Sequence, residues 1–250
     1  MIASLLLLAA GLNHGPWHEL LVKYVTPHSR VDYAGLRKDG LPALDSYLAT
    51  VAKPWPAGMP AQERKAGLIN AYNALTVRWM AGHYPVPSIW RTSKPFTEAR
   101  HTVNGRLYSL DQIETELRDM GDPRVHSVLV CAARSCPPLR REAYDAEKLE
   151  FQLDDNTRAW LANGVLHRFD PGKREARVSQ IFEWYRGDFE KSGGSVGAFL
   201  AKYGPPAAGF LREPGAKIGY IDYYWGVNDS GTAGDSYGWL AFRWDYLRNK

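Results

Sequence analysis

The sequence predicts an α+β fold, a single mixed domain in which helices pack around a small sheet. Apolar residues recur at helical spacing along much of the chain, whereas strand-like runs are short and few. The two kinds of segment alternate irregularly, which disfavours a doubly wound parallel sheet. Because 45% of the 250 residues are hydrophobic, the chain can bury a large core and form a sizeable domain.

The strongest helix signals lie in the first third of the chain. Apolar residues recur every three or four positions over residues 17–24 and 41–51, which predicts two helices. The same spacing is clearest from Leu68 to Met80, and this pattern ends before Pro85. We expect the helix over residues 68–80 to lie in the core.

A hairpin and a short helix are expected next. Residues 101–108 hold Asn104 and Gly105 between short alternating runs, and this dipeptide is a strong local signal of a β-hairpin. Ser109 can then accept a hydrogen bond from the first turn of a helix that ends near Arg118. The local chemistry therefore predicts strand, turn, strand and helix in succession.

The apolar run at residues 125–130 predicts a buried strand inside the sheet, with the 68–80 helix packed on it. Further helices are expected over residues 145–163 and 181–189, and a late strand over 217–224. These elements complete a helix-rich domain with a small sheet.

The chain is expected to divide into a leader at residues 1–15, a domain at 16–228 and an aromatic tail at 229–250 that packs on the domain. The opening `MIASLLLLAA` resembles the apolar region and cleavage zone of a secretory signal, so we expect cleavage after Ala10 and a periplasmic or secreted protein. No later stretch approaches the roughly 18 to 20 apolar residues of a membrane span, so no integral span is expected. The net charge of +4 is spread diffusely, which argues against a nucleic-acid partner.

Several segments together resemble a family named domain of unknown function 547 (DUF547). They are `VDYAGL`, `INAYNALTV`, `YSLDQIE`, `DPRVHSVLVCAARSCPPLR`, `IFEWYRGDF` and `IDYYWGVN`, in the family's order between Trp17 and Asn228. The resemblance implies an exported bacterial domain but no activity, and a papain- or transglutaminase-like arrangement is one form the α+β domain could take. Thr115 stands where the family has a histidine, Tyr224 where it has an aspartate, and Gly67 and Leu68 where it has two aromatics.

Cys131 and Cys136 are the only cysteines and the main candidates for chemistry. Arg134, Arg140 and Arg141 are close in sequence and could stabilise a reactive thiolate. Two cysteines separated by four residues in an exported chain could equally form a structural disulfide. Both interpretations stay open, as does a dithiol redox pair, which the absence of a two-residue spacing weakens.

His126 and Glu114 are the candidate partners of a Cys131 nucleophile. His126 could act as general base, although five residues of extended strand would separate it from Cys131 by about 16 Å and place the two side chains on opposite faces. Glu114 could orient a base or pair with Arg124. We expect no metal, because three ligands on one segment without a fourth are a weak zinc signal, and no cofactor.

Candidate substrate-binding residues are Asn70, Asn73, Arg134 and Cys136. The two asparagines share a face of the 68–80 helix with apolar neighbours, and buried amides need hydrogen-bond partners. They could hold the backbone of the cysteine segment or bind a substrate carbonyl. His167 is a lower-ranked alternative base, in a polar turn region.

Two functional hypotheses follow. The first is an exported thiol-dependent hydrolase or acyl transferase acting on an amide or peptide-like substrate, in which Cys131→Ala abolishes activity and Cys136→Ser leaves more than a trace. The second is a non-catalytic domain, stabilised by a Cys131–Cys136 disulfide, with a ligand groove formed by aromatic side chains of the tail. These side chains are Tyr223, Trp225, Tyr237 and Trp239.

Overall fold

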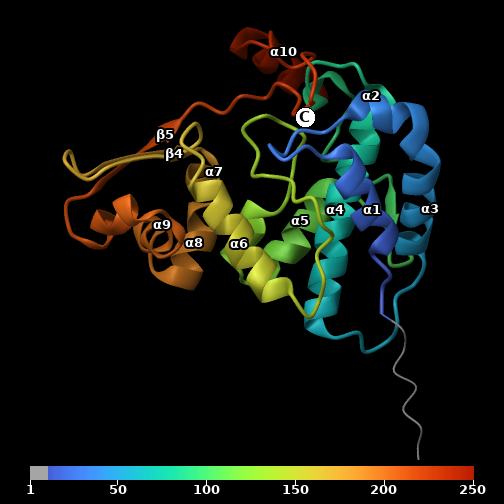
Figure 1. The fold of residues 1–250 in the computed structure, drawn as a ribbon, viewed down its shortest axis with the longest axis horizontal. Helices are drawn as coiled ribbons and strands as arrows, with labels where there is room; N and C mark the ends of the chain where they lie inside the picture. The colour runs from blue at the N-terminus through green and yellow to red at the C-terminus, as the bar shows by residue number, and fades with distance from the viewer. Residues whose placement is uncertain (1–10) are drawn as a thin grey trace, which may run out of the picture.

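The computed structural model describes residues 11–250, so the predicted signal cleavage after Ala10 concerns residues outside the described part. Many helices combine with a two-stranded hairpin and a three-stranded sheet, which confirms the single α+β domain. The three-stranded sheet lies at one end of the molecule (Figure 1). The chain already packs on this domain at Leu12, whose N–H donates to Glu63 at 2.9 Å. No helix within residues 11–250 is both long and apolar enough to cross a membrane.

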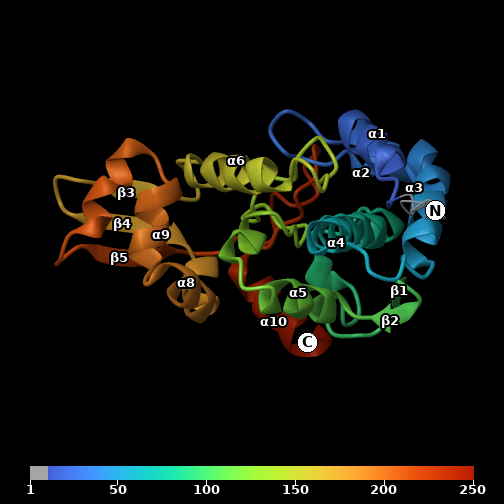
Figure 2. The ribbon, with the colours of Figure 1, turned by 90° about the horizontal axis from the view of Figure 1, so that it is seen from below.

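The larger of two hydrophobic clusters is built around α4 (Ala61–His83). Figure 2 shows α4 in the middle of this half of the molecule, with other elements on several sides. Leu68, Ile69 and Met80 are fully buried, because a helix covered on several sides must be apolar on each of them. The remaining elements of this half are α1 (Gly15–Tyr24), α2 (Tyr33–Gly35), η1 (Leu36–Gly40), α3 (Leu41–Ala52), η2 (Ile89–Arg91), β1 (His101–Val103), β2 (Arg106–Tyr108), α5 (Leu110–Asp119) and η3 (Pro123–Ser127).

The smaller cluster contains the three-stranded sheet and the helices that follow α6 (Leu149–Leu161). Strand order is β3-β4-β5; β3 pairs antiparallel with β4, and β4 pairs parallel with β5, with Ala176 opposite Ile218. In Figure 2, α6 lies between the two halves of the molecule. The other elements here are β3 (Arg168–Asp170), β4 (Glu175–Ser179), α7 (Ile181–Trp184), α8 (Arg186–Gly193), α9 (Val196–Tyr203), η4 (Pro206–Arg212) and β5 (Lys217–Ile221).

After β5 the chain returns to the larger cluster and ends in α10 (Trp239–Asn249). The aromatic ring of Phe242 stacks on Trp225 with centroids 5.3 Å apart, and Tyr246 meets Trp90 edge-on at 4.8 Å. The tail therefore packs on the larger cluster through these aromatic rings. It covers the end of the molecule at the top of Figure 1.

The local turn and cap predictions are confirmed. Asn104 and Gly105 have φ of 49° and 69°, the left-handed backbone that a tight hairpin turn requires. Ser109 accepts from the N–H of Gln112, and the Gln112 side chain accepts from the N–H of Ser109, which makes a complete capping box. Short-range chemistry thus fixes β1, β2 and the start of α5.

The predicted strand over residues 125–130 is wrong. Its first residues belong to the 3-10 helix η3, which opens where the Asp122 side chain accepts from the N–H of Arg124 at 3.0 Å. The residues that follow bond to the side chain of Asn73 on α4 rather than to a neighbouring strand. An apolar run shows that a segment is buried, but not which partner satisfies its backbone. The 68–80 pattern does form a core helix that packs on this segment.

Three later boundaries differ from the sequence predictions. The helix expected from Asp145 begins at Leu149, because the Asp145 carboxylate accepts from the N–H groups of Glu147 and Lys148 and holds a turn. The helix expected over 181–189 divides at Tyr185, whose φ of −111° and ψ of 24° are not helical. The late strand ends at Ile221.

Candidate functional site

The segment that carries the candidate nucleophile is held by a single amide. The Asn73 side chain donates to the carbonyl of Val128 at 2.9 Å and accepts from the N–H of Val130 at 2.9 Å. Asn73 is 1% exposed, so no bulk water competes for these bonds. One side chain on α4 therefore satisfies two buried backbone groups, as a neighbouring strand would.

Residues 131–136 form a tight turn, which we call the cysteine loop. Cys131 and Cys136 are paired as a disulfide. Ala132 between them has a φ of 61°, a left-handed conformation that is costly for a residue with a side chain. Such strain collects at functional sites and is held there by the surrounding structure. The restraint here comes from residues 224–228, which run antiparallel to the loop.

Polar groups surround the two sulfur atoms. The N–H groups of Cys131 and Ala133 donate to Sγ of Cys136 at 3.0 and 3.3 Å. The hydroxyl of Tyr223 lies 3.1 Å from Sγ of Cys131 and 3.3 Å from Sγ of Cys136. If the bridge is reduced, the same donors stabilise negative charge on sulfur.

A cavity of about 130 Å³ brings the predicted catalytic residues together. Cys131, His126 and Glu114 all line it, although they come from the cysteine loop, η3 and α5. An extended strand was expected to keep His126 and Cys131 about 16 Å apart on opposite faces. That separation does not apply, because the segment that joins them is not a strand. Other lining side chains include Tyr72, Asp111, Trp184, Tyr185, Tyr223 and Trp225.

His126 is buried and held by Asp188 of α8. Its Nε2 lies 2.8 Å from a carboxylate oxygen of Asp188, and its ring stacks on Tyr185 with centroids 4.2 Å apart. Desolvation lowers the pKa of His126 to about 4 and outweighs the opposing effect of Asp188. Desolvation would raise the pKa of Asp188, but hydrogen bonds from Arg118 and His126 reverse this and lower it.

These two pKa directions fix the tautomer of His126. A neutral imidazole facing an ionised carboxylate must carry its proton on Nε2, so that Nε2 donates to Asp188. Nδ1 then keeps its lone pair. Among the described residues, no side chain or backbone group bonds to Nδ1. His126 can therefore accept a proton at Nδ1, although a pKa near 4 makes it a weak base.

Two carboxyl groups of α5 also face the cavity. Desolvation raises the pKa of Glu114, and the nearby charge of Asp111 acts in the same direction. Desolvation likewise raises the pKa of Asp111. Glu114 does not pair with Arg124. The cavity thus combines a histidine that resists protonation with carboxyl groups that resist ionisation, and perturbed titratable groups of this kind gather at functional sites.

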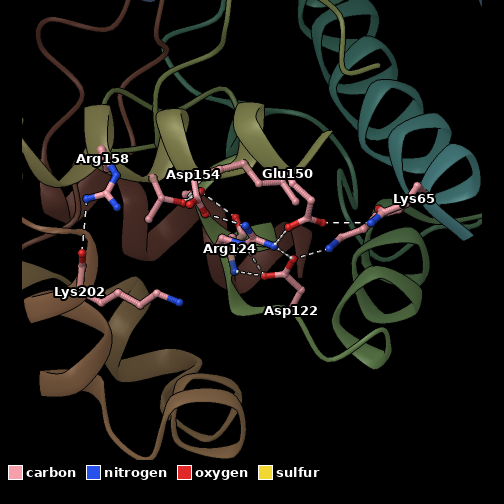
Figure 3. A network of polar contacts seen from close by, with 11 residues as sticks. Lys65, Asp122, Arg124, Glu150, Asp154, Arg158 and Lys202 are labelled. Carbon is pink, nitrogen blue, oxygen red and sulfur yellow. Dashed lines mark hydrogen bonds and ion pairs between the residues drawn. The ribbon is translucent and has the colours of Figure 1, made fainter. Parts of the chain in front are cut away.

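Arg124 instead holds the segment that precedes His126. Its guanidinium bonds to Asp122 of the η3 start and, at 2.6 Å each, to Glu150 and Asp154 of α6. Lys65 of α4 pairs with Asp122 from the other side. Figure 3 shows these groups converging between α4, α6 and the loop before η3. This network is part of the frame that positions His126.

None of the four predicted substrate-binding residues lines the cavity. Asn70 donates to the carbonyl of Tyr144 at 2.7 Å and accepts from its N–H at 2.9 Å, so both asparagines bond to backbone. Arg134 bonds to the carbonyl of Val227 at 3.1 Å and to carboxylates of the tail. Cys136 is the buried member of the cysteine pair.

The other arginines near the cysteines are also engaged elsewhere. Arg140 pairs with Glu142 and Asp155, and Arg141 donates to the carbonyl of Val22 at 2.9 Å. His167, the lower-ranked base, is buried in the smaller cluster beside Trp160. No group of three or more histidine, cysteine or acidic residues within residues 11–250 is arranged to hold a metal ion.

Sequence reasoning missed Asp188, Tyr185 and the position of Tyr223 at the sulfur atoms. All three lie in segments that resemble the family, `IFEWYRGDF` and `IDYYWGVN`, but nothing local marks them as partners of His126 or Cys131. Tyr223 reaches Cys131 across 92 positions of sequence. The sequence pointed to Tyr223 only as part of the expected aromatic groove, and not as a partner of the cysteines.

An aromatic groove of about 570 Å³ adjoins the cavity and shares Trp184, Tyr185, Tyr223 and Trp225 with it. Its other wall is α10, through Trp239, Phe242 and Tyr246. Tyr237 lines a neighbouring hollow of about 430 Å³ rather than this groove. The predicted tail groove is therefore largely present as a physical feature.

Together, the fold and the site define an α+β protein in which Cys131, His126 and two carboxyl groups meet in one aromatic-walled cavity. Residues 56–161, which contain Cys131, His126 and Glu114, match the family described as protein of unknown function, DUF547. No curated protein and no solved structure matches the chain. The papain- or transglutaminase-like arrangement stays a prediction.

Proposed function

We propose that this protein is an exported thiol-dependent hydrolase or acyl transferase acting on an amide or peptide-like substrate. The observation that carries the proposal is the convergence of Cys131, His126 and Glu114, from separate elements, on one cavity. The nucleophile is Cys131 because it lines the cavity and Cys136 does not.

The paired cysteines require a reductant before any attack. A dithiol gives two electrons to the bridge and leaves as its own disulfide, which frees both thiols. The Cys131 thiolate then attacks the substrate carbonyl carbon, so that a C–S bond forms and the C–N bond breaks. The thiol proton passes through Nδ1 of His126 to the leaving nitrogen. Water, or a second amine, finally takes the acyl group from sulfur.

The surrounding residues have distinct parts in this scheme. Asp188 is a positioning residue, because it holds the tautomer of His126 that leaves Nδ1 free. The hydroxyl of Tyr223, 3.1 Å from the Cys131 sulfur, is close enough to donate to an oxyanion formed beside it. Glu114, with its raised pKa, supplies a proton donor on the same cavity wall.

A covalent acyl-enzyme assay tests the proposal. The protein is incubated with p-nitrophenyl acetate before and after treatment with dithiothreitol, and intact mass reports acetylation. Acetyl transfer to Cys131 is expected only in the protein that has been reduced with dithiothreitol. Cys131→Ala abolishes it, Cys136→Ser leaves more than a trace, and His126→Gln slows it by roughly 100-fold or more. Glu114→Gln slows it, whereas Glu116→Gln, on the same helix but outside the cavity lining, does not.

The alternative is a ligand-binding domain stabilised by the disulfide, favoured by the paired cysteines and the adjoining aromatic groove. It predicts no acetylation in either redox state. It also predicts that Cys131→Ala and Cys136→Ser lower the melting temperature equally, with no thiol labelled by iodoacetamide in the native protein. Loss of activity in Cys136→Ser alone, with the fold intact, would move the nucleophile to Cys136.

A further inference from the structure

The outer surface of α10 is the most apolar exposed feature of the described chain. Trp239, Leu240, Trp244 and Leu247 are 62%, 78%, 66% and 72% exposed. Leu240, Trp244 and Leu247 are spaced by four and three positions, so they lie on one face of the helix. Large apolar side chains exposed elsewhere, such as Leu107 and Phe151, come one to an element. Four within a single helix therefore need a separate explanation.

The inner face of α10 already has its partners. Phe242 and Tyr246 pack on Trp225 and Trp90, and the buried carboxylate of Asp245 pairs with Arg91 and accepts from the hydroxyl of Tyr237 at 2.9 Å. The outer apolar residues are not needed to attach the helix. Nor do they line the groove, apart from Trp239.

The exposed charged side chains of α10 are all cationic. Arg243, Arg248 and Lys250 are exposed, and the sole acidic side chain between residues 239 and 250 is the buried Asp245. The Arg243 guanidinium lies over the ring of Trp239 at 5.0 Å, which keeps a cation among the indoles. The outer face thus combines two tryptophans, two leucines and three cations without an exposed carboxylate.

We propose that the outer face of α10 docks on an anionic lipid surface. Tryptophan concentrates at the boundary between lipid headgroups and acyl chains, leucine inserts below it, and exposed Arg and Lys pair with anionic headgroups. A second copy of the chain fits the surface less well, because a symmetric contact would bring the three cations of each copy against those of the other. Figure 1 shows α10 at the outer edge of the molecule, where a flat surface can reach it.

Vesicle flotation tests the docking. The full chain is mixed with vesicles of phosphatidylcholine alone or with 30% phosphatidylglycerol. Binding to the anionic vesicles is expected, together with a blue shift of tryptophan fluorescence and weaker binding at high salt. Leu240→Asp with Leu247→Asp abolishes the binding, whereas Phe151→Asp with Val165→Asp, a pair equally exposed on other elements, does not.

The cationic contribution is tested separately. Arg243→Gln with Arg248→Gln lowers the partition coefficient by roughly 25-fold, about fivefold for each cation removed. Lys173→Gln with Lys217→Gln removes the same charge at the far end of the sheet and leaves partitioning within about twofold of wild type. All variants share the apolar residues 1–10, so any lipid binding by that segment cancels in the comparison.

Three outcomes would overturn the proposal. One is equal binding to neutral and anionic vesicles, and another is equal loss of binding in the control variants. The third is a chain that binds neither kind of vesicle but sediments as a dimer. If Leu240→Asp with Leu247→Asp dissociates that dimer, the partner of α10 is a second copy of the chain. Circular dichroism melts of every variant show whether a loss reflects unfolding.

Discussion

Removing the Asn73 amide should destabilise the domain and release the cysteine loop together. Asn73→Ala leaves the N–H of Val130 and the carbonyl of Val128 without their partner, and both residues are 1% exposed. Each buried unsatisfied backbone group costs about 1–3 kcal/mol. With partial relaxation, we expect the free energy of unfolding to fall by about 3 kcal/mol, which lowers the melting temperature by roughly 6–12 °C for a chain of this length.

Asn70→Ala is the matched control for this experiment. Asn70 makes the same two bonds from the same helix, but to Tyr144 rather than to the segment before Cys131. Both variants should lose similar stability, measured by thermal and urea unfolding. Faster iodoacetamide labelling of Cys131 in dithiothreitol should occur in Asn73→Ala alone. A loss below about 1 kcal/mol, with labelling rates that match Asn70→Ala, would show that the amide neither supports the backbone nor restrains the loop.

Three further predictions concern acid stability, the tail and α10. Desolvation lowers the pKa of His167 to about 3, so between pH 6.5 and 3 the unfolded chain binds a proton that the folded chain does not. Acidification from pH 8 to 5 should therefore cost about 2 kcal/mol through His167 alone, besides the loss from other buried histidines such as His126. His167→Phe should reduce the loss in the urea-derived stability profile by that amount. An unchanged profile in that variant would contradict the assignment. A Cβ at Gly234 would overlap the backbone of Val227, so Gly234→Ala should lower the melting temperature by several degrees. A Cβ at Gly238 meets nothing within 4 Å, so Gly238→Ala should leave the melting temperature unchanged. Arg91→Met removes the ion pair of the buried Asp245 and leaves the hydroxyl of Tyr237 as the remaining side-chain partner of that carboxylate. An unpaired buried charge weakens the attachment of α10, so trypsin should remove this helix faster than from wild type. Arg106→Met, on the exposed hairpin, should keep the wild-type rate.

The parts of the fold that short-range chemistry determines were predictable. The hairpin turn at Asn104 and Gly105 and the capping box at Ser109 depend on residues within three or four positions of one another. The core helix α4 was visible because its apolar spacing is long and regular. The chain at residues 125–130 was not, because its backbone partner is the side chain of Asn73, more than 50 positions earlier in the sequence.

The candidate site was predictable in part for the same reason. Residue type alone selected Cys131, His126 and Glu114, and the structure places all three at one cavity. Asp188 was missed, and Tyr223 was expected only in the aromatic groove. Each meets its partner far along the sequence, Asp188 reaching His126 across 62 positions and Tyr223 reaching Cys131 across 92. Acidic and tyrosine side chains are common, so only the folded arrangement distinguishes these two from the rest.

The side chain of Tyr223 packs against both hydrophobic clusters, and the cavity lies where these two clusters meet. Tyr72 and Cys131 belong to one side of this boundary, and Ile181 and Tyr185 to the other. The walls of the cavity therefore come from both hydrophobic clusters. A ligand bound in the cavity would contact both halves of the molecule and couple their unfolding. The two halves would then unfold in one cooperative transition.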